Sequence, residues 1–328
     1  MESVASDASN YRRKAPASQG ACPTDAPDAP TRMPEPGGPS MYDRGMLIAQ
    51  ITDTHISTPG SLNDRYFRTP EHLERAVEHL NRLTPRPDVV LATGDLVERG
   101  EPAEYARLRT IVDRLAMPLY VIPGNHDARE PLARAFADRA YLPQDGGFLH
   151  YTVEQWPVRL IGLDTQVPGQ PGGRLCPERL GWLDARLGEG PARPTVVFMH
   201  HPPFVTGMQA MDDMGLEGKA ELAEVIRHHP QVERVVCGHV HRPMTRRFAG
   251  TVATTCPATA HQLALDLLPA RRLAVVMEPP ACMLHLWLDE AALVSHVSVI
   301  GDERPPLTLY DGRRWLRDAV LPAAFHPR

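Results

Sequence analysis

Short apolar runs alternate with amphipathic stretches along most of the chain. The runs are apolar over several consecutive residues, which is typical of strands buried on both faces. We predict such strands over residues 46–51, 89–92, 119–122, 150–153, 158–163, 195–199 and 232–236. Between many of them, apolar residues recur with the period of a helix that has one buried face. We predict these helices over residues 69–83, 102–115, 131–137, 177–187 and 216–228. Strands and helices that alternate at a pitch of about 30 to 45 residues form βαβ units, so the sequence predicts an α/β fold.

The first predicted helix has a recognisable start. Thr69 is followed by Pro70 and Glu71, and threonine is a preferred N-cap while proline is favoured at the first helical position. We therefore expect Thr69 to cap this helix. His79 lies off its apolar stripe and is expected at the surface.

The two ends of the chain depart from this alternation. Residues 1–43 contain no Leu, Ile, Phe or Trp, so they are predicted to be a disordered extension. The strand-like runs at residues 247–248, 251–254, 282–288 and 293–299 follow one another without helices. This predicts antiparallel pairing and a second sheet, completed by strands within 282–299. Residues 263–328 are interrupted by prolines and are predicted to form a small C-terminal appendage that packs on the core or on a partner subunit. Residues 44–262 remain as the main domain.

Composition and charge limit the possible partners. A chain of 328 residues with 42% apolar and 23% charged residues is typical of a globular protein with one large domain and appendages, or with two domains. The net charge of −5 provides no basic surface for a nucleic-acid backbone. We therefore expect no long nucleic acid as a partner, and an anionic substrate would have to be attracted locally.

The cysteines and the hydropathy indicate a compartment. Five widely spaced cysteines include no Cys-x-x-Cys pair, so neither a disulfide framework nor a structural zinc site is predicted. The first residues lack the charged and apolar pattern of a signal peptide. No apolar run reaches the roughly 18 residues of a membrane span. The sequence predicts a soluble, cytoplasmic protein without a membrane partner.

Polar side chains with metal-binding chemistry follow five of the predicted strands. They are Asp53, His55, Asp95, Asn125, His126, His200, His239 and His241. In α/β sheets, ligands bind where the loops after the carboxyl ends of the strands converge. Carboxylates, imidazoles and an amide without a thiolate suit hard to borderline metals. Without His126, seven of these residues remain as candidate ligands, which exceeds the need of one ion. Two ions about 3.5–4 Å apart that share a carboxylate could use all seven in phosphoryl transfer.

The motifs that contain these residues form an ordered set. They are Asp-x-His at 53–55, Gly-Asp at 94–95, Gly-Asn-His-Asp at 124–127, His-His-Pro-Pro at 200–203 and Gly-His-x-His at 238–241. In this order they resemble the calcineurin-like metallophosphoesterase superfamily. Residues 207–212, 238–243 and 259–262 are similar to the class III cyclic nucleotide phosphodiesterases and the dinuclear glycerophosphodiesterases within it.

The resemblance implies a fold and two metal sites. The fold would be a four-layer αββα sandwich of two mixed β-sheets flanked by helices, with residues 44–262 as the catalytic domain. Asp53, His55 and His241 would hold the first metal ion, and Asn125, His200 and His239 the second. Asp95 would bridge the two ions together with a water or hydroxide. The ions could be iron, manganese, zinc or cobalt.

The resemblance also implies roles around the substrate. His126 would contact the phosphate or protonate the leaving group, and His261 would lie near the phosphate. His201 is adjacent to His200, and either could be the metal ligand; we favour His200. His201 would then support a metal ligand without binding the ion, or contact the substrate. Asp127 is expected to orient a nearby histidine.

Two loops remain open to alternative interpretations. Asn63, Arg65 and Tyr66 could contact the substrate or form a solvated loop. Met208, Met211 and Met214 could form a flexible lid or pack as ordinary loop residues.

The implied activity is hydrolysis of a small phosphodiester by a metal-bridging hydroxide. The substrate would be a 3′,5′-cyclic nucleotide such as cAMP, or a glycerophosphodiester. The alternatives are a phosphomonoesterase or other phosphoesterase with the same dinuclear site and, with less support, a non-catalytic binding scaffold. Related enzymes form dimers or larger assemblies, so a homo-oligomer formed through residues 263–328 is expected.

Overall fold

The computed structural model describes residues 45–269, 272–288 and 292–301. The predicted disordered extension over residues 1–43 lies outside the described residues. The predicted C-terminal appendage also lies outside them from residue 302 to residue 328.

The first β-sheet contains the opening strand of the domain. Its strand order is β15-β14-β1-β2-β3, with parallel pairing among β1, β2 and β3 and antiparallel pairing of β14 with both β1 and β15. The bounds are Met46–Ile51 for β1, Val89–Thr93 for β2, Leu119–Ile122 for β3, Ala281–Leu288 for β14 and Ala292–Val299 for β15. The sheet is therefore mixed.

The second β-sheet has the order β10-β11-β9-β7-β5-β4. Its central strands β11, β9, β7 and β5 are parallel, and an antiparallel strand lies at each edge. The bounds are Tyr151–Val153 for β4, Arg159–Leu163 for β5, Thr195–Met199 for β7, Val232–Cys237 for β9, Met244–Phe248 for β10 and Thr251–Thr255 for β11. This sheet is mixed as well.

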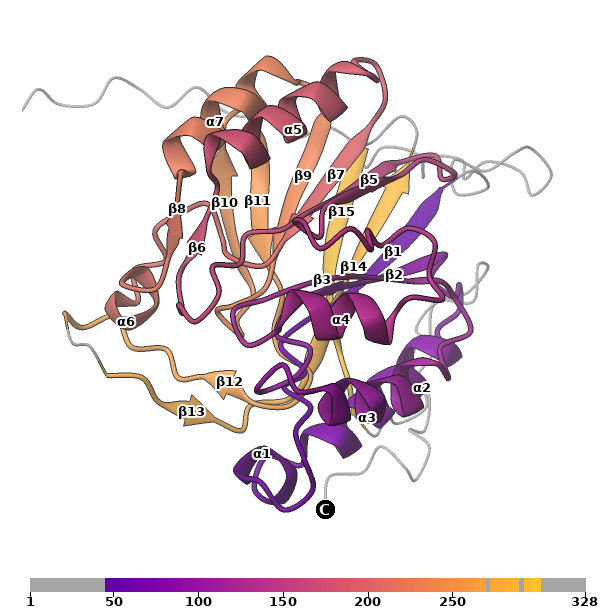
Figure 1. Ribbon diagram of the computed structural model, residues 1–328, viewed down its shortest axis with the longest axis vertical. Helices are drawn as coiled ribbons and strands as arrows, with labels where there is room; N and C mark the ends of the chain where they lie inside the picture. The colour runs from indigo at the N-terminus through magenta and orange to yellow at the C-terminus, as the bar shows by residue number, and fades with distance from the viewer. Residues whose placement is uncertain (1–44, 270–271, 289–291, 302–328) are drawn as a thin grey trace, which may run out of the picture. The chain divides into compact units, whose positions relative to one another are not determined.

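Helices cover the outer faces of the two sheets. The helices α2, α3 and α4 lie beside the first sheet, and α5 and α7 lie over the second, as Figure 1 shows. Their bounds are Thr69–Arg82 for α2, Pro102–Val112 for α3, Arg129–Ala135 for α4, Pro177–Gly188 for α5 and Lys219–His228 for α7. The predicted four-layer αββα arrangement is thereby confirmed.

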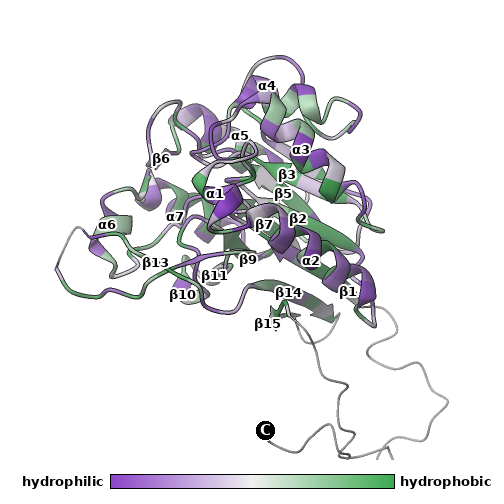
Figure 2. Ribbon diagram, turned by 90° about the horizontal axis from the view of Figure 1, so that it is seen from below, coloured by the Kyte–Doolittle hydropathy of each residue, from purple (hydrophilic) through white to green (hydrophobic). Residues whose placement is uncertain are grey.

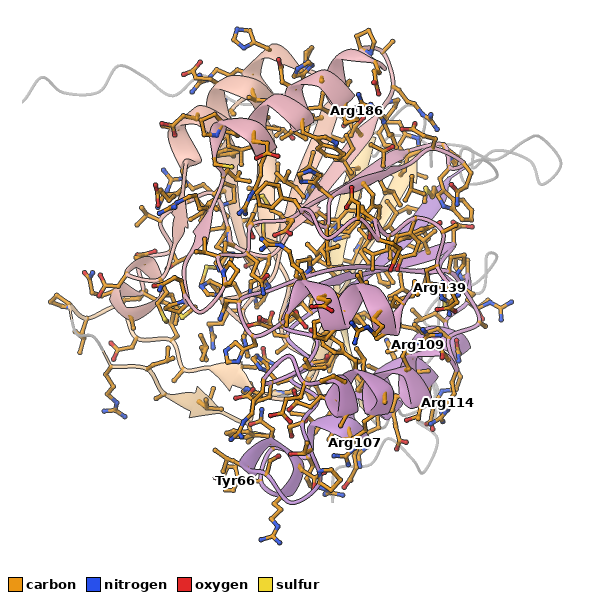
Figure 3. All side chains as sticks on the ribbon, viewed as in Figure 1. Tyr66, Arg107, Arg109, Arg114, Arg139 and Arg186 are labelled. Atoms are coloured by element: carbon orange, nitrogen blue, oxygen red, sulfur yellow. The ribbon has the colours of Figure 1, made fainter. Side chains whose placement is uncertain are left out.

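Four short elements border the site described below. Two are the short helices α1 (Leu62–Arg65) and α6 (Gln209–Asp212). The other two are small ladders. One pairs β6 (Gly173–Arg174) with β8 (Leu216–Glu217), and the other pairs β12 (Gln262–Leu263) with β13 (Val275–Val276). Arg107 of α3 fixes the α1 loop, because its guanidinium donates to the Ser57 carbonyl at 2.8 Å and to Asp64 at 2.7 Å. Tyr66, just after α1, points outward and is exposed (Figure 3).

The main core lies between the two sheets. Strand β2 contacts β7, and β3 contacts β5. Leu91 and Ile122 of the first sheet and Leu160 and Phe198 of the second are completely buried. Figure 2 shows these strands as hydrophobic, while the helices carry hydrophilic residues. Burial of each such side chain stabilises the fold by about 1.5–3 kcal/mol relative to exposure.

The C-terminal strands do not complete the second sheet, so that prediction is wrong. Strand β14 instead pairs with β1 in the first sheet, from Met46 opposite Trp287 to Gln50 opposite Met283. Buried backbone groups must be hydrogen-bonded, and β14 satisfies the edge of β1 that β2 leaves open. The predicted antiparallel pairing is correct, since β10 pairs with β11 and β14 with β15 in this way.

Two predictions about the first helix also prove wrong. Arg68, with a φ of +50°, occupies the N-cap position of α2. The Thr69 hydroxyl instead donates to the His55 carbonyl at 3.1 Å, and so it fixes the loop after β1. His79 is buried rather than exposed, and its Nε2 lies 2.8 Å from the Ser298 hydroxyl of β15.

Helix α7 begins later than the pattern predicts. The predicted start, Leu216, belongs to β8, and α7 begins at Lys219. Gly218 separates the two elements with a φ of +90°, a left-handed conformation that favours glycine.

The segment after residue 262 divides into two parts. Strands β12 and β13 form a small ladder beside the cavity described below, and β14 and β15 return to the first sheet. The domain boundary at residues 262 and 263 stays a prediction. None of the described helices combines the length and the apolar character needed to cross a membrane.

Candidate metal centre

The loops after five parallel strands bring the predicted residues together. Asp53 and His55 follow β1, Asp95 follows β2, and Asn125 follows β3. His200 follows β7, and the His239–His241 segment follows β9. The two sheets therefore contribute to one site at the carboxyl ends of their strands.

One group of donor atoms gathers around Asp53. His241 Nε2 lies 3.3 Å from Asp53 Oδ1 and 3.2 Å from His55 Nε2. A second group gathers around His200, whose Nε2 lies 3.1 Å from Asn125 Oδ1. The ring of His239 lies 5.1 Å from that of His200, measured between centroids.

Asp95 connects the two groups. Its Oδ2 atom lies 3.3 Å from His200 Nε2 and 3.8 Å from His55 Nε2. Its other carboxylate oxygen, Oδ1, accepts the backbone N–H of His126 at 2.9 Å. One oxygen of Asp95 therefore faces both groups of candidate metal ligands.

Each of the four histidines in these groups is fixed by a hydrogen bond at one of its two ring nitrogens. His55 Nδ1 donates to the Glu98 carboxylate at 2.9 Å. His200 Nδ1 donates to the Thr93 carbonyl at 2.8 Å, and His241 Nδ1 to the His261 carbonyl at 3.0 Å. His239 differs, since its Nε2 donates to the Met214 carbonyl at 3.1 Å.

These bonds select the neutral tautomers that a metal requires. A histidine that donates from one ring nitrogen carries a lone pair on the other, and this is the usual support for a metal ligand. The free nitrogens are Nε2 of His55, His200 and His241, and Nδ1 of His239. The donor set therefore fits two metal ions of borderline or hard character.

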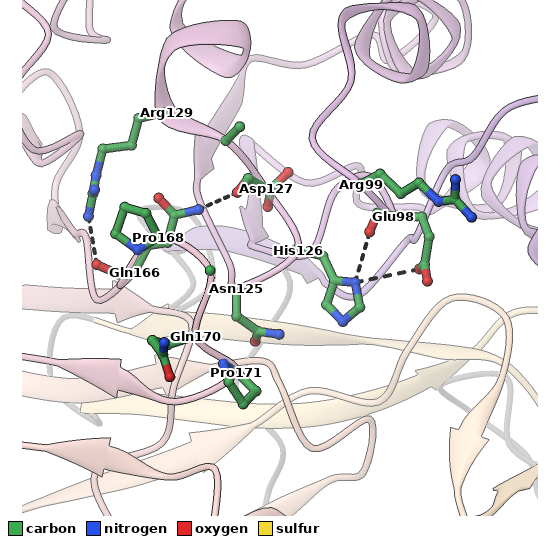
Figure 4. Close-up of a pocket in the computed structure, with 12 residues that line it drawn as sticks. Glu98, Arg99, Asn125, His126, Asp127, Arg129, Gln166, Pro168, Gln170 and Pro171 are labelled. Carbon is green, nitrogen blue, oxygen red and sulfur yellow. Dashed lines mark hydrogen bonds and ion pairs between the residues drawn. The ribbon is translucent and has the colours of Figure 1, made fainter.

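Glu98 is a supporting residue that the sequence reasoning missed. Its carboxylate holds His55 and accepts a hydrogen bond from Asn63 Nδ2 at 2.7 Å. Its backbone carbonyl accepts a hydrogen bond from His126 Nδ1 at 2.9 Å (Figure 4). The only signal in the sequence is an acidic residue in the loop that follows Asp95, which is too common to identify this role.

The buried carboxylates of the site depend on nearby positive charge. Burial raises the pKa of Asp53 and of Asp95, but the neighbouring histidines, His241 for Asp53 and His200 for Asp95, outweigh burial and hold both pKa values below the ordinary range. Burial lowers the pKa of His200, yet Asp95 raises it to about 9. Burial and His200 together lower the pKa of His239 to about 3. Two buried carboxylates are costly unless positive charge pairs with them.

The backbone of the site is held in an unusual conformation. Asp53, His55, Asp95, His239 and His241 all have positive φ angles, between +43° and +71°. Each such residue costs about 1–3 kcal/mol and is typical of a functional site. Backbone bonds between loops hold this conformation, for example from Asp53 N to the Gly94 carbonyl and from His55 N to the Asp95 carbonyl, both at 3.0 Å.

The glycines of the motifs are required by close packing. A Cβ atom on Gly124 would lie 2.2 Å from Asp95 Oδ1. A Cβ atom on Gly238 would lie 2.1 Å from the Thr52 hydroxyl. Only glycine leaves room for the loops to approach each other so closely.

A cavity of about 310 Å³ opens onto the metal ligands. Its inner wall carries His55, Asp95, Asn125, His126, His239, His241 and His261. Asp53 and His200 are completely buried behind this wall. The outer wall is mostly apolar and comes from α1, α6 and the β12–β13 ladder.

His261 and His201 lie in different positions relative to this cavity. His261 lines it and stacks on Phe67 with 4.4 Å between ring centroids. Its buried Nδ1 has no hydrogen-bond partner among the residues that the structure describes. Burial and the neighbouring His241 lower the pKa of His261 to about 2. His201 is completely buried, with its ring nitrogens 2.8 Å from the Thr165 hydroxyl and 3.2 Å from the Pro171 carbonyl. This position favours a supporting role for His201 over a substrate contact.

Asp127 does not orient a histidine, contrary to expectation. Its Oδ2 accepts the backbone N–H of Gly124 at 2.8 Å and of Leu96 at 3.1 Å. Its Oδ1 accepts the Tyr105 hydroxyl at 2.9 Å. Burial and the nearby Asp95 raise the pKa of Asp127 to about 7. The carboxyl therefore holds the loop that presents Asn125.

The two loops with open interpretations are now placed. Asn63 is buried and lines the cavity, whereas Arg65 and Tyr66 are exposed and do not line it. Met211 and Met214 line the cavity. Met208 and Met211 also pack in a small cluster with Val240 and Leu263.

Comparison with known proteins places the chain among phosphoesterases. The sequence model of the calcineurin-like phosphoesterases matches residues 46–243. A probable glycerophosphodiester phosphodiesterase of Arcobacter nitrofigilis is 37% identical over 83% of this chain and 100% of its own length. A probable cyclic nucleotide phosphodiesterase of Synechococcus is 39% identical over 74% of this chain and 93% of its own length.

Solved structures show the same fold at low sequence identity. A dimetal phosphatase of Danio rerio superposes with a TM-score of 0.55 at 14% identity, over 78% of this chain and 99% of that one. A purple acid phosphatase of yellow lupin superposes with a TM-score of 0.58 at 13% identity, over 79% of this chain and 52% of that one. These likenesses concern the fold alone.

We expect Gly124→Ala to disrupt the site. The added Cβ would displace Asp95, so bound metal measured by elemental analysis should fall. The midpoint of urea unfolding should fall by the equivalent of about 1–3 kcal/mol, the usual cost of overpacking.

Gly181→Ala is the matched control. A Cβ at Gly181, within α5, meets no atom within 4 Å. This variant should keep its metal and gain about 0.5–1 kcal/mol of stability, because alanine favours a helix. Full metal content in Gly124→Ala would contradict the packing argument.

Proposed function

The chain belongs to the calcineurin-like phosphoesterase family, and we propose that it hydrolyses small phosphodiesters at a dinuclear metal site. The observation that carries this proposal is the position of Asp95, whose Oδ2 faces both groups of candidate ligands. The names of the relatives support a diester substrate, since they include glycerophosphodiester and cyclic nucleotide phosphodiesterases. A glycerophosphodiester or a 3′,5′-cyclic nucleotide is the substrate to test first.

The ligands divide between two ions. Asp53, His55 and His241 would hold one, and Asn125, His200 and His239 the other, with Asp95 shared. Two ions there would lower the pKa of a bound water towards neutrality and offset the charge of the phosphate. The donor set accepts iron, manganese, zinc or cobalt.

His126 is placed to transfer a proton to the leaving alcohol. Its Nδ1 donates to the Glu98 carbonyl, which leaves Nε2 for the substrate. Burial would lower the pKa of His126, but the Asp95 carboxylate and the Glu98 carbonyl outweigh burial and raise it. Histidine has an unperturbed pKa near 6.5, so it can hold a proton for a leaving group near neutral pH. His261, on the cavity wall, would contact the phosphate.

We also propose that the protein is a homo-oligomer, a dimer or larger, assembled through the segment after residue 262. Support comes from the described part of this segment, in which Leu265, Leu267 and Leu268 are exposed. Contiguous exposed apolar side chains are typical of interaction surfaces. Light scattering that gives the mass of one chain would exclude this assembly. The expected cytoplasmic location stays a prediction.

We expect His126→Ala to lower turnover while both metal ions remain bound. Loss of a general acid costs about 10²–10⁴-fold in rate, measured as kcat on a phosphodiester. His228→Ala, at the exposed end of α7, is the control and should match the wild type. Loss of metal from His126→Ala would make His126 a ligand instead.

A substrate panel tests the proposed function. Protein stripped with a chelator should be inactive, since its ligands alone supply no activated water. Addition of Mn²⁺, Fe²⁺, Zn²⁺ or Co²⁺ should restore hydrolysis of bis-p-nitrophenyl phosphate, and of a glycerophosphodiester or a cyclic nucleotide, above that of p-nitrophenyl phosphate. A preference for the monoester would favour a phosphomonoesterase. No hydrolysis with any metal would favour a non-catalytic scaffold.

A further inference from the structure

A buried histidine outside the candidate metal ligands has a partner at each of its ring nitrogens. His285 of β14 is completely buried. Its Nδ1 lies 2.6 Å from the Ser295 hydroxyl of β15, and its Nε2 lies 3.1 Å from Gln50 Oε1 of β1. Burial lowers the pKa of His285 to about 3, so its ring stays neutral. Gln50 is completely buried as well, and buried polar side chains are costly unless they are hydrogen-bonded.

The hydrogen bonds of these residues form one chain with a single direction. The Gln50 amide nitrogen donates to the Cys237 carbonyl at 2.9 Å, which turns the amide oxygen towards His285. An amide oxygen accepts, so His285 donates from Nε2 and accepts at Nδ1. The Ser295 hydroxyl therefore donates to His285, and its oxygen accepts the Arg234 guanidinium at 2.8 Å. The chain cannot reverse, because a guanidinium only donates and a carbonyl only accepts.

This chain of bonds begins and ends on one strand of the second sheet. Arg234 and Cys237 both belong to β9. The residues between them lie on β15, β14 and β1, which are neighbours in the first sheet (Figure 1). The chain therefore ties β9 to the first sheet at two points.

The amide of Gln50 reaches the supports of two candidate ligands. Besides the Cys237 carbonyl, it binds the Thr93 hydroxyl, to which it donates at 2.9 Å. The Thr93 carbonyl accepts His200 Nδ1 at 2.8 Å, the bond that leaves Nε2 of that ring for a metal. Cys237 ends β9 shortly before His239. His200 and His239 are both candidate ligands of the second metal ion.

The histidines assigned to the first metal ion are fixed without this chain. His55 Nδ1 donates to the Glu98 carboxylate at 2.9 Å. His241 Nδ1 donates to the His261 carbonyl at 3.0 Å. Loss of the chain should therefore affect the second ion more than the first.

We infer that Gln50 and His285 are positioning residues for the second metal ion. The hydrogen bond from His285 holds the Gln50 amide in one orientation. That amide holds the ends of β2 and β9 in the places that direct His200 and His239 towards the ion. Neither Gln50 nor His285 touches the ion or the substrate. The inference rests on the proposed function, since it requires two ions per chain.

The affinity of each metal ion tests this inference. Apo full-length protein is dialysed to equilibrium against a series of Mn²⁺ concentrations, and elemental analysis gives two dissociation constants. Asn125→Ala removes a candidate ligand, so the constant that it raises more belongs to the second ion. Gln50→Met keeps the length of the side chain but loses its hydrogen bonds. It should raise the constant of the second ion by about 10- to 100-fold, the usual effect of losing a residue that orients a ligand, and that of the first by about threefold or less.

Gln231→Met is the matched control. Gln231 is also buried, and its amide donates to the Leu187 carbonyl at 3.0 Å. It lies directly before β9, at the end of the strand opposite to Cys237. Because this substitution also removes a buried amide, it should lower stability but leave both dissociation constants as in the wild type. Equal effects of the two Gln→Met substitutions, or unchanged constants in Gln50→Met, would overturn the inference.

Variants of His285 test its place in the chain. His285→Gln still has an amide that can donate to Gln50 and an oxygen that can accept from Ser295, so it should preserve both constants. His285→Leu can do neither and should weaken binding of the second ion. The double variant Gln50→Met/His285→Leu should lose no more affinity than Gln50→Met alone, because His285 acts through Gln50. Multiplied effects in the double variant, or no rescue by glutamine, would contradict this role of His285.

Ser295→Ala keeps the test decisive should the buried variants fail to fold. Ser295 is only half-buried, and the substitution removes the hydroxyl that donates to His285. The constant of the second ion should rise by about 2- to 10-fold, the range for one hydrogen bond, while that of the first stays unchanged. An unchanged second constant would overturn the inference alone. A wild-type protein that binds no Mn²⁺ would refute the proposed function together with it.

Discussion

Asp53 and Asp95 are buried close together, at 0% and 2% exposure, among histidines that mostly carry hydrogen bonds suited to their neutral forms. Burial of a charged carboxylate is strongly unfavourable unless a cation or several hydrogen-bond donors compensate for it. The surrounding structure supplies some donors, such as the N–H groups of His239 and His126, but leaves Asp95 Oδ2 between two groups of imidazoles. Compensation of this buried negative charge is the constraint that the rest of the site serves, and two metal ions would provide it.

Packing and hydrogen bonds outside the candidate ligands hold this arrangement in place. Two sheets bring the carboxyl ends of their strands to one edge, while the core between them, with Leu91 and Phe198 buried, stabilises the whole. Gln50 links the two sheets. Its amide nitrogen donates to the Thr93 hydroxyl of the first sheet and to the Cys237 carbonyl of the second, both at 2.9 Å. Strained left-handed residues persist in such a setting because their neighbours allow no alternative. Motif glycines such as Gly124 belong to the same packing.

Much of the fold and most of the candidate site follow from local sequence signals. Each of five strands ends at a ligand-type residue, so the convergence of Asp53, Asp95 and His200 could be predicted from strand topology. The partners of β14 could not, because antiparallel pairing leaves the choice of sheet to long-range packing. Glu98 was missed and Asp127 was misassigned for a related reason. The sequence shows an acidic residue in a loop, but it does not show which group will donate a hydrogen bond to that residue.

The sharing of Asp95 between two ions is the central claim, and metal stoichiometry tests it most directly. Apo protein is dialysed against Mn²⁺, and the bound metal per chain is measured by elemental analysis for the wild type and for Asp95→Asn. The account predicts two ions per chain in the wild type and weakened binding of both in the variant, because one carboxylate oxygen serves both sites. A single ion in the wild type, or a variant that loses one ion while it holds the other with unchanged affinity, would contradict it.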